Sequence, residues 1–403
     1  MSERKQTAAD AGWAEVVAAC ALSAVPGLGA TALARMAKRF EDSLTKAMKA
    51  GPEKLLSLAE ELELRQPAID FLRREPDLEE LGLWAVAAAK AAGARVILLG
   101  DECYPTLLRQ IENPPPLLYV RGHLQTDLPR IAVVGSREVD EQGIGLARKF
   151  GDGFARAGVQ VISGGARGID RAAHDGALWG LGSTVAVLGC GIDVTYPPEH
   201  GELFDRLSRG AGAVVSEFPP GTPPTTHNFP RRNRTISGLS SAVVVVRAAV
   251  RSGALVTADH AAMQKRAIFA VPGDVSNTLS TGTNALLRRG AAKPATSALD
   301  VLQGLEWPIP PELTEPPPDE SKRNLDAGFA GLTAPTEPPR PDHEVIDEAS
   351  LRLWRLLDER TPAHVDDLAL RAQVSAQEAL RKLAELELKG MCLQRPGKFF
   401  LRR

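Results

Sequence analysis

The stretch VQVISGGARGIDRAAHDGAL, residues 159–178, decides the fold of this chain. It begins with a continuous apolar run, which is typical of a strand buried on both faces of a parallel sheet. Glycines then turn the chain into a segment whose apolar residues have helical spacing. A similar apolar run ending in small residues is RIAVVGSR, residues 130–137. Both segments therefore predict strand–loop–helix units.

Five more runs of this kind lie between residues 94 and 273, most of them ending in glycine or another small residue. They are ARVILLG (94–100), STVAVLG (183–189), AVVSEF (213–218), AVVVVRA (242–248) and AIFAVPG (267–273). Amphipathic stretches separate them, and this alternation predicts a parallel sheet with helices on both faces. The predicted fold class is α/β, with an extended Rossmann-like domain over residues 85–303 as its core.

A helical segment precedes the predicted sheet. Residues 1–80 are rich in Ala, Leu, Lys and Glu, with apolar residues three and four apart, which predicts a helical domain. Within it, Pro26-Gly27-Leu28-Gly29 has the shape of a helix-hairpin-helix turn, whose exposed N–H groups can hold a phosphate. The alternative is a plain turn that uses glycine for its conformational freedom.

The chain after the predicted sheet divides into a linker and a small domain. Ten of the 37 residues from 306 to 342 are proline, which predicts an extended linker over residues 304–343. Residues 344–403 contain a first helical pattern, a helix–turn–helix pattern and two strand-like runs that turn at Pro396-Gly397. These patterns predict a winged-helix-like domain.

Composition limits the classes to which the protein can belong. Its 403 residues suggest two or three domains, and 48 Lys and Arg against 50 Asp and Glu exclude a polycation. Any nucleic-acid site must therefore be a local basic patch. The four cysteines, at 20, 103, 190 and 392, lie far apart, which fits the reducing cytoplasm. The sequence also predicts no signal peptide and no membrane span.

Several catalytic and cofactor motifs are absent from the sequence. It contains no P-loop, no H-E-x-x-H metal motif and no G-x-S-x-G elbow after a strand. Gly143-x-Gly145 falls within a predicted helix and is a weak dinucleotide signal. We therefore expect no cofactor, no bound metal and no catalytic residue, and we predict that the protein is not an enzyme.

Two loops rich in glycine follow predicted strands and carry arginines. They are Gly135-Ser136-Arg137 and Gly164-Gly165-Ala166-Arg167-Gly168. Ligands of open α/β sheets bind at this edge, where small residues admit a phosphate and a helix N-terminus and arginines attract it. The loops therefore predict an anion site. The alternative is that the glycines serve tight packing and the arginines are surface charges.

A long stretch with charges of one sign comes next. Residues 218–258 contain no acidic residue but five arginines, at 231, 232, 234, 247 and 251. This pattern suits a polyanion longer than one phosphate. A second stretch without acids, residues 275–299, carries Arg288, Arg289 and Lys293.

Individual side chains near these loops have more than one interpretation. Four can stack on bases, as in single-strand binders, although core packing is favoured for each: Tyr196, Phe218, His227 and Phe229. His174 has the position of a candidate base, but packing against a loop is favoured. Asp170 is expected to cap its helix or to order Arg167, and Asp193 to brace the turn before Tyr196.

The loops resemble those of the DNA-processing protein A family, also called DprA or Smf. The matching stretches cover about 103–292 in family order and include YPTLLRQIENPPPLLYVRG, IAVVGSR, VISGGARGIDRAAHDGAL, TVAVLGCGIDVTYPPEH, SEFPPGTPP, NFPRRNRTISGLS, SGALVTA and FAVPGDVSNTLSTGTNALLRRGA. The resemblance implies a cytoplasmic, non-enzymatic protein that binds single-stranded DNA. It also implies protection of incoming DNA in natural transformation, loading of the recombinase RecA for homologous recombination, and a homodimer formed through the Rossmann-like domain.

The resemblance also implies the flanking domains and the DNA contacts. The N-terminal domain is expected to be sterile-alpha-motif-like or helix-hairpin-helix, and the C-terminal one a winged helix that binds either DNA or protein. By motif, DNA-binding residues are expected in both glycine loops and in the segment from 229 to 234. They are Gly135, Ser136, Arg137, Gly164, Gly165, Arg167, Gly168, Phe229, Arg231, Arg232, Asn233 and Arg234.

Three positions depart from the family pattern. Gly165 stands where many members have Leu, and Arg247 where Glu is common. Ser183 stands where some members have a lysine that contacts a phosphate, so this contact is in doubt.

Two other functions compete with the one that the family implies. The same Rossmann variety hosts phosphoribohydrolases, which are nucleotide N-glycosidases, but their P-G-G-x-G-T loop is absent here. A regulator that binds duplex DNA through the winged helix is the third possibility.

Overall fold

The computed structural model describes residues 2–210, 212–314, 348–357, 363–372, 374–388, 391–395 and 399–402. The chain forms two compact units, residues 1–323 and residues 324–403. Most of the predicted linker, from 315 onward, and the predicted turn at Pro396-Gly397 lie outside the described residues.

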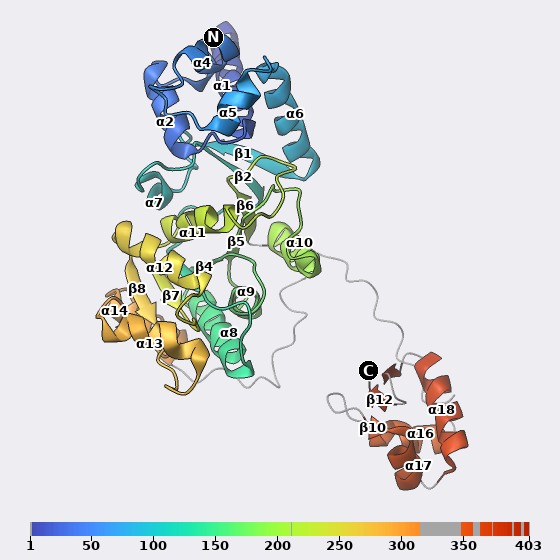
Figure 1. Cartoon of the computed structure of the whole chain (residues 1–403). Helices are drawn as coiled ribbons and strands as arrows, with labels where there is room; N and C mark the ends of the chain where they lie inside the picture. The colour runs from blue at the N-terminus through green and yellow to red at the C-terminus, as the bar shows by residue number, and fades with distance from the viewer. Residues whose placement is uncertain are drawn as a thin grey trace. The chain divides into compact units, whose positions relative to one another are not determined.

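Helices form the beginning of the first unit (Figure 1). They are α1 (Ser2–Ala24), α2 (Ala30–Arg39), α3 (Leu44–Lys49), α4 (Gly51–Ser57), α5 (Gln66–Leu72) and α6 (Leu78–Ala91). The predicted turn from Pro26 to Gly29 joins α1 to α2, and Gly27 has a φ of +84°. At Gly82 of α6, a Cβ would lie 2.4 Å from the carbonyl oxygen of Val17, so glycine lets α6 pack directly on α1.

A nine-stranded sheet follows, in the order β1-β2-β6-β5-β4-β3-β7-β8-β9. Its strands are β1 (Ala94–Leu98), β2 (Leu117–Gly122), β3 (Arg130–Val134), β4 (Gln160–Ser163), β5 (Thr184–Leu188), β6 (Ala213–Ser216), β7 (Ala242–Val245), β8 (Ala267–Ala270) and β9 (Lys293–Pro294). Each of the seven predicted runs contains one strand. From β6 to β9 all neighbouring strands are parallel, which confirms the predicted α/β sheet.

The first edge of the sheet differs from the prediction. β1 pairs with β2, and β2 pairs with β6, both in antiparallel orientation. The expectation that β1 belongs to the parallel array was therefore wrong. An apolar run indicates burial on both faces but carries no information about strand direction, and β2 was not among the predicted runs.

Helices cover both faces of the sheet, as side-chain alternation along the strands requires. On one face, Ile131 and Val133 pack with α8 (Glu141–Arg156), α9 (Ile169–Trp179) and α14 (Ala298–Gly304). Further along this face, Ala186 and Leu188 of β5 pack with α10 (Gly201–Arg209) and the N-terminal helices. On the other face, Ala132 and Val134 pack with α7 (Thr106–Arg109), α11 (Asn228–Gly238) and α12 (Gly253–Met263).

The described end of the first unit continues beyond the predicted sheet domain. After α13 (Thr281–Arg288) and α14, the chain forms the short helix α15 (Pro311–Thr314). Leu305, Trp307 and Leu313 pack against the core between α8, α9 and the sheet. The first residues of the predicted linker are thus part of the folded unit.

This packing determines where the chain can be truncated without loss of stability. A variant ending at residue 323 should keep its thermal stability and its DNA binding, because every residue of the site described below precedes 260. A variant ending at 303 should lose roughly 2–4 kcal/mol of unfolding free energy, because it lacks Leu305, Trp307 and Leu313. Urea denaturation of both variants measures the difference, and equal stability would contradict the structural role of residues 305–313.

The second unit has the elements of a winged helix. They are α16 (Glu348–Leu356), β10 (Ala363–His364), α17 (Val365–Ala372), α18 (Ala376–Leu388), β11 (Cys392–Arg395) and β12 (Phe399–Arg402). The strands form a small sheet in the order β10-β12-β11. Leu353, Leu368, Leu383 and Phe400 form its core with exposed fractions of 0%. The predicted winged-helix-like domain is confirmed.

Candidate nucleic-acid interface

The sheet reverses its winding between β3 and β7. From β3 the chain proceeds outward through β4 and β5 to β6, and it returns through α11 to β7 on the other side of β3. In open parallel sheets, ligands bind beyond the carboxyl ends of the strands at such a switch point. The topology therefore brings both predicted anion loops to the edge where a ligand is expected.

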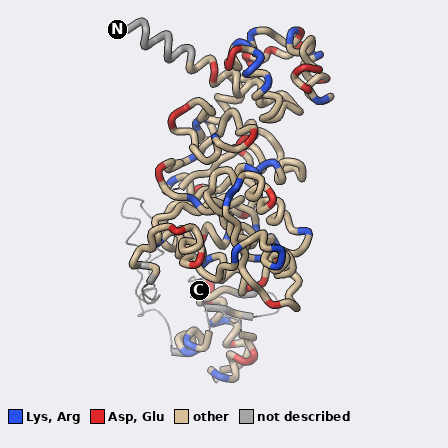
Figure 2. Tube along the Cα trace, turned by 90° about the vertical axis from the view of Figure 1, so that its left-hand side faces the viewer, with Lys and Arg blue, Asp and Glu red and all other residues tan. Residues whose placement is uncertain are grey.

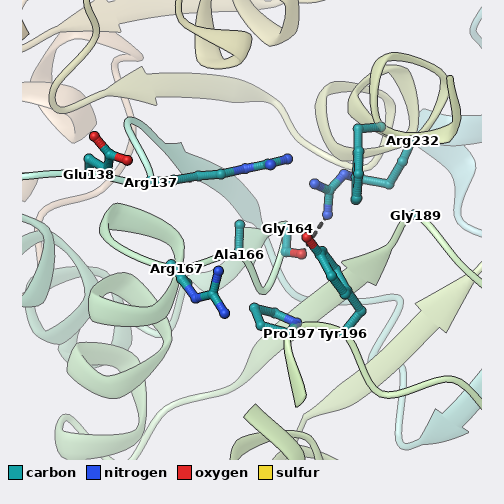
Figure 3. Close-up of a pocket in the computed structure, with 10 residues that line it drawn as sticks. Arg137, Glu138, Gly164, Ala166, Arg167, Gly189, Tyr196, Pro197 and Arg232 are labelled. Atoms are coloured by element: carbon teal, nitrogen blue, oxygen red, sulfur yellow. Dashed lines mark hydrogen bonds between the residues drawn. The ribbon is translucent and has the colours of Figure 1, made fainter. Parts of the chain in front are cut away.

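Two adjoining cavities occupy this edge. The smaller, about 270 Å³, is lined by the loops after β3, β4 and β5 and by α11 (Figure 3). The larger, about 820 Å³, extends along the start of α12. Both are lined by Arg137, Glu138, Ala166, Tyr196, Phe229 and Arg232, so together they form one recess, here named the cleft.

Glycine is required where the two loops touch. Gly168 has a φ of +73°, and a Cβ there would lie 2.4 Å from the carbonyl oxygen of Ser136. At Gly135 a Cβ would lie 2.5 Å from Cγ1 of Ile169. These glycines therefore have a packing role of their own, whether or not the cleft holds a ligand.

Arg232 is a buried residue that connects separate segments of the cleft wall. Its exposed fraction is 4%, and Nη1 donates to the carbonyl oxygens of Gly164 at 2.5 Å and Val187 at 2.6 Å. Asp170, also buried, accepts from the backbone N–H of Gly164 at 3.1 Å. Burial lowers the pKa of Arg232 and raises that of Asp170, while each charge opposes the effect on the other. Arg232 thus joins the loop after β4 to the end of strand β5.

Arg137 differs from Arg232 because it is exposed. Its guanidinium carbon lies 4.8 Å from the centre of the Phe229 ring. Figure 3 shows its side chain extending across the cleft toward Arg232, while Glu138 points away. Within the described residues, no carboxylate forms an ion pair with Arg137. Its charge is therefore available to an anion.

Arg167 is exposed but already has an acidic partner. It forms an ion pair with Glu199, which lies in the turn before α10. The guanidinium lowers the pKa of Glu199 to about 2. Sequence reasoning missed Glu199, which follows the Tyr-Pro-Pro segment directly and lies 32 residues from Arg167.

The remaining two predicted arginines lie on another side of α11. Arg231 and Arg234 contact the carboxylate of Glu217 at 3.3 and 3.8 Å, and this side chain is fully buried. Arg231 also lies over the ring of Phe218, 5.0 Å from its centre. Neither arginine lines the cleft, whereas Phe229, Arg232 and Asn233 do.

Of the side chains that were candidates for stacking on bases, two line the cleft and two do not. Phe229 and Tyr196 line the cleft with ring centres 5.8 Å apart, and they present apolar surface beside Arg137. Phe218 is only 3% exposed and belongs to the core, as the packing interpretation predicted. His227 is exposed at the start of α11 but does not line the cleft.

Three side chains singled out in the sequence have structural roles. His174 is fully buried and bonds to the Thr184 hydroxyl at 2.7 Å, and burial lowers its pKa to about 3, so it stays neutral near neutral pH. Asp170 neither caps α9 nor contacts Arg167, and that expectation was wrong. Its side chain reaches back to the loop after β4 instead. Asp193 accepts from the backbone N–H of Gly221 at 2.9 Å and thereby joins two loops.

The positions that depart from the family pattern are buried or lie away from the cleft. Arg247 is 2% exposed and lies 3.7 Å from Asp140. Ser183 precedes β5 at the opposite end from the cleft, where Gln160 donates to its hydroxyl at 2.6 Å. Gly165 has a φ of +64°, which favours glycine there. Arg247 therefore adds no charge to the cleft.

Charges of both signs alternate along the first unit (Figure 2), so the basic character of the cleft is local. Among the described helices, none combines the length and apolarity that a membrane crossing requires. The described residues contain no group of three His, Cys, Asp or Glu side chains that could hold a metal ion.

Comparisons with known proteins agree with the order of the loops. Residues 95–306 match the family DNA recombination-mediator protein A, and residues 333–398 match the DprA winged helix domain. Protein Smf of Escherichia coli is 40% identical over 303 residues, which are 74% of each chain. Protein Smf of Synechocystis is 32% identical over 406 residues, covering 95% of this chain and 98% of the relative.

A solved structure shares the architecture. The X-ray structure of DNA processing protein A (DprA) from Streptococcus pneumoniae has a TM-score of 0.57 and 32% identity, and the match covers 71% of this chain and 95% of that one. The family match and these relatives agree with the switch point and the cleft. The chain therefore belongs to the DNA recombination-mediator protein A family, whose members are also named DprA and Smf.

Proposed function

We propose that the cleft binds single-stranded DNA, with a phosphate at Arg137 and unpaired bases against Phe229 and Tyr196. The observation that carries this proposal is the exposed guanidinium of Arg137, 4.8 Å from the Phe229 ring and without a carboxylate partner in the described residues. Arginine beside an aromatic face is the combination that single-strand binders use, since every base has a face that stacks. Gly135 and Ser136 would line the same phosphate, and the loop after β4 would bring to it the backbone N–H groups of Gly165, Arg167 and Gly168. Those of Gly164 and Ala166 already donate to Asp170, and that of Ser136 donates to the carbonyl oxygen of Arg247.

Single strands fit this site better than duplex DNA for a physical reason. In a duplex the bases are stacked on one another, so Phe229 and Tyr196 have no base face to contact. A single strand presents unpaired bases, whose faces can contact the two rings without the free-energy cost of opening a duplex. The basic groups alone would attract both forms, and therefore the aromatic pair is the source of discrimination.

We also infer that the protein is not an enzyme. The cleft is lined by two carboxylates, of which Asp170 is held by the loop after β4 and Glu138 points away from it. Nucleotide N-glycosidases need a carboxylate that acts on the glycosidic bond. Release of ribose phosphate from a nucleoside monophosphate would contradict this inference.

Family membership supports the cellular role. We infer that the protein acts in the cytoplasm as a homodimer, protects incoming single strands in natural transformation, and loads RecA onto them for recombination. A basic cleft beside stacking aromatics is suited to holding a strand by its backbone without reading its sequence. Such a strand can then be passed to another protein that also binds without sequence preference.

The test of this function is a gel-shift comparison of single-stranded and duplex DNA across a salt series. Single strands should bind at least about tenfold more tightly, because stacking contributes about 1–3 kcal/mol per base. The logarithm of the affinity should fall linearly with the logarithm of the salt concentration, by about 0.7 for each phosphate contacted. Equal affinity for duplex DNA at every salt concentration would overturn the proposal.

A further inference from the structure

A second basic cavity lies on the other side of α11 from the cleft. It has a volume of about 380 Å³, and it is bordered by residues 27–32 at the start of α2 and by the end of the α4–α5 connection. Four arginines line it: Arg35, Arg65, Arg231 and Arg234. They come from three separate elements, and we name this cavity the hollow.

The hollow retains positive charge after its ion pairs are counted. Arg35 pairs with Glu63 at 2.6 Å, and Arg231 and Arg234 share the buried carboxylate of Glu217. Four guanidinium groups thus meet two carboxylates. Arg65 is exposed and, among the described residues, its side chain forms no ion pair or hydrogen bond. The charge that remains is available to an anion.

The start of α2 adds donors to these arginines. Gly29 occupies the N-cap position, and no side chain caps the helix. The first backbone N–H groups of α2 have no partner within the helix, and they carry partial positive charge. Gly29 would meet nothing within 4 Å of an added Cβ, so the backbone is accessible at this point.

One helix connects the hollow with the cleft. Arg232 and Asn233 line the cleft, while Arg231 and Arg234, their neighbours on α11, line the hollow. Acidic residues are absent from the sequence of α11. A polyanion that crosses α11 from the cleft therefore enters a second basic cavity without passing an acidic side chain of that helix.

We propose that the hollow is a second phosphate-binding site for the same DNA strand, which leaves the cleft, crosses α11 and is held by Arg65, Arg35 and the backbone N–H groups of α2. This inference rests on the proposed function of the cleft. It assigns the N-terminal helices a direct part in holding DNA. Strands long enough to span both sites gain contacts that short strands cannot make.

The test compares two oligothymidines, of about 4 and about 16 nucleotides, which are the ends of the range of site sizes for single-strand-binding OB-folds. Arg65→Ala should weaken binding of the long strand about fivefold, lower its salt slope by about 0.7, and leave the short strand unaffected. Glu63→Gln should act in the opposite direction, because it removes a carboxylate and releases Arg35. Arg73→Ala is the matched control, because this exposed arginine of the same domain does not line the hollow.

The outcomes separate this inference from the function of the cleft. Unchanged binding of the long strand by Arg65→Ala would overturn the second site, and so would an equal loss for both strand lengths. Arg137→Ala tested on the short strand decides the role of the cleft independently. Circular dichroism of each variant shows that it is folded, which we expect because Arg65 and Glu63 are exposed.

Discussion

Replacing Arg137 with alanine should weaken binding of single-stranded DNA about 10-fold to 100-fold and leave the stability of the protein unchanged. A hydrogen bond to a charged group contributes about 1.5–3 kcal/mol, and Arg137 has no competing carboxylate within the described residues. Its guanidinium also stacks on Phe229, where a base would gain a cation–π contact. The salt slope should fall by about 0.7. Fluorescence anisotropy across a salt series measures both quantities.

Two further variants make the Arg137 result specific. Arg148→Ala removes an exposed arginine of α8 that does not line the cleft, so its affinity should match the parent. Arg137→Lys keeps the charge but loses the planar group above Phe229, and we expect an intermediate affinity with the parent's salt slope. Parent-like binding by a folded Arg137→Ala protein would show that the DNA path does not pass through the cleft.

The sequence predicts much of the fold because a buried parallel sheet produces an unusually direct signal. Strands such as β3 and β7 are apolar on both faces, so runs of four and five consecutive apolar residues identify them without an alignment. Strand direction has no such signal, and β1 was therefore placed in the wrong orientation. β2 follows three consecutive prolines, which obscured it, and the four-residue helices α7 and α15 are too short to show periodicity.

The sequence predicts which loops form the candidate site, but it does not predict which of their arginines are already paired with carboxylates. Glu217 immediately precedes the stretch without acids that begins at residue 218, and its carboxylate contacts Arg231 and Arg234. Glu199 reaches Arg167 from a different loop. Which arginines are paired depends on contacts between segments far apart in the sequence. Spacing alone therefore could not separate Arg137, which is free to bind, from its neighbours.

Helix geometry explains why Arg232 differs in role from Arg231 and Arg234 on α11. Successive residues of a helix point about 100° apart, so Arg232 faces away from the side of Arg231, whereas Arg234, three residues after Arg231, returns to that side. Only Arg232 points into the protein, where it meets the carbonyl oxygens of Gly164 and Val187. The sequence shows three similar residues, and the tertiary packing decides that one of them supports the fold.

Replacing Arg232 with alanine should therefore destabilise the protein by about 3–5 kcal/mol, the usual cost of leaving a buried charge without its partner. The substitution removes the donor to two buried carbonyl oxygens and the cation that offsets the charge of Asp170. Urea denaturation measures the loss. DNA binding should fall as well, because the loop after β4 is no longer held to the end of β5. This combined loss distinguishes Arg232 from Arg137, whose removal should affect binding alone.

The loss should depend on pH in a defined direction. Without Arg232, the largest of the interactions that oppose the effect of burial on Asp170 is lost, so the pKa of Asp170 in the folded protein should rise further above the ordinary value. At low pH Asp170 is protonated and uncharged in the variant, and the stability difference from the parent is then smallest. As the pH rises from the folded parent's Asp170 pKa to the variant's higher one, the folded variant holds a proton that the parent and the unfolded chain have released, and the difference grows. Denaturation at about pH 5 and about pH 8 should show a larger deficit at the higher value.

A double-mutant cycle with Asp170→Asn tests the cause of this loss. Asparagine keeps an oxygen that can accept from the backbone N–H of Gly164 but carries no charge. In the Arg232→Ala background it should restore part of the stability and remove most of the pH dependence. In the parent background the same change should destabilise, because Arg232 would then be the unpaired charge. Additive effects of the two substitutions would show that Arg232 stabilises the loops through the carbonyl oxygens of Gly164 and Val187 alone.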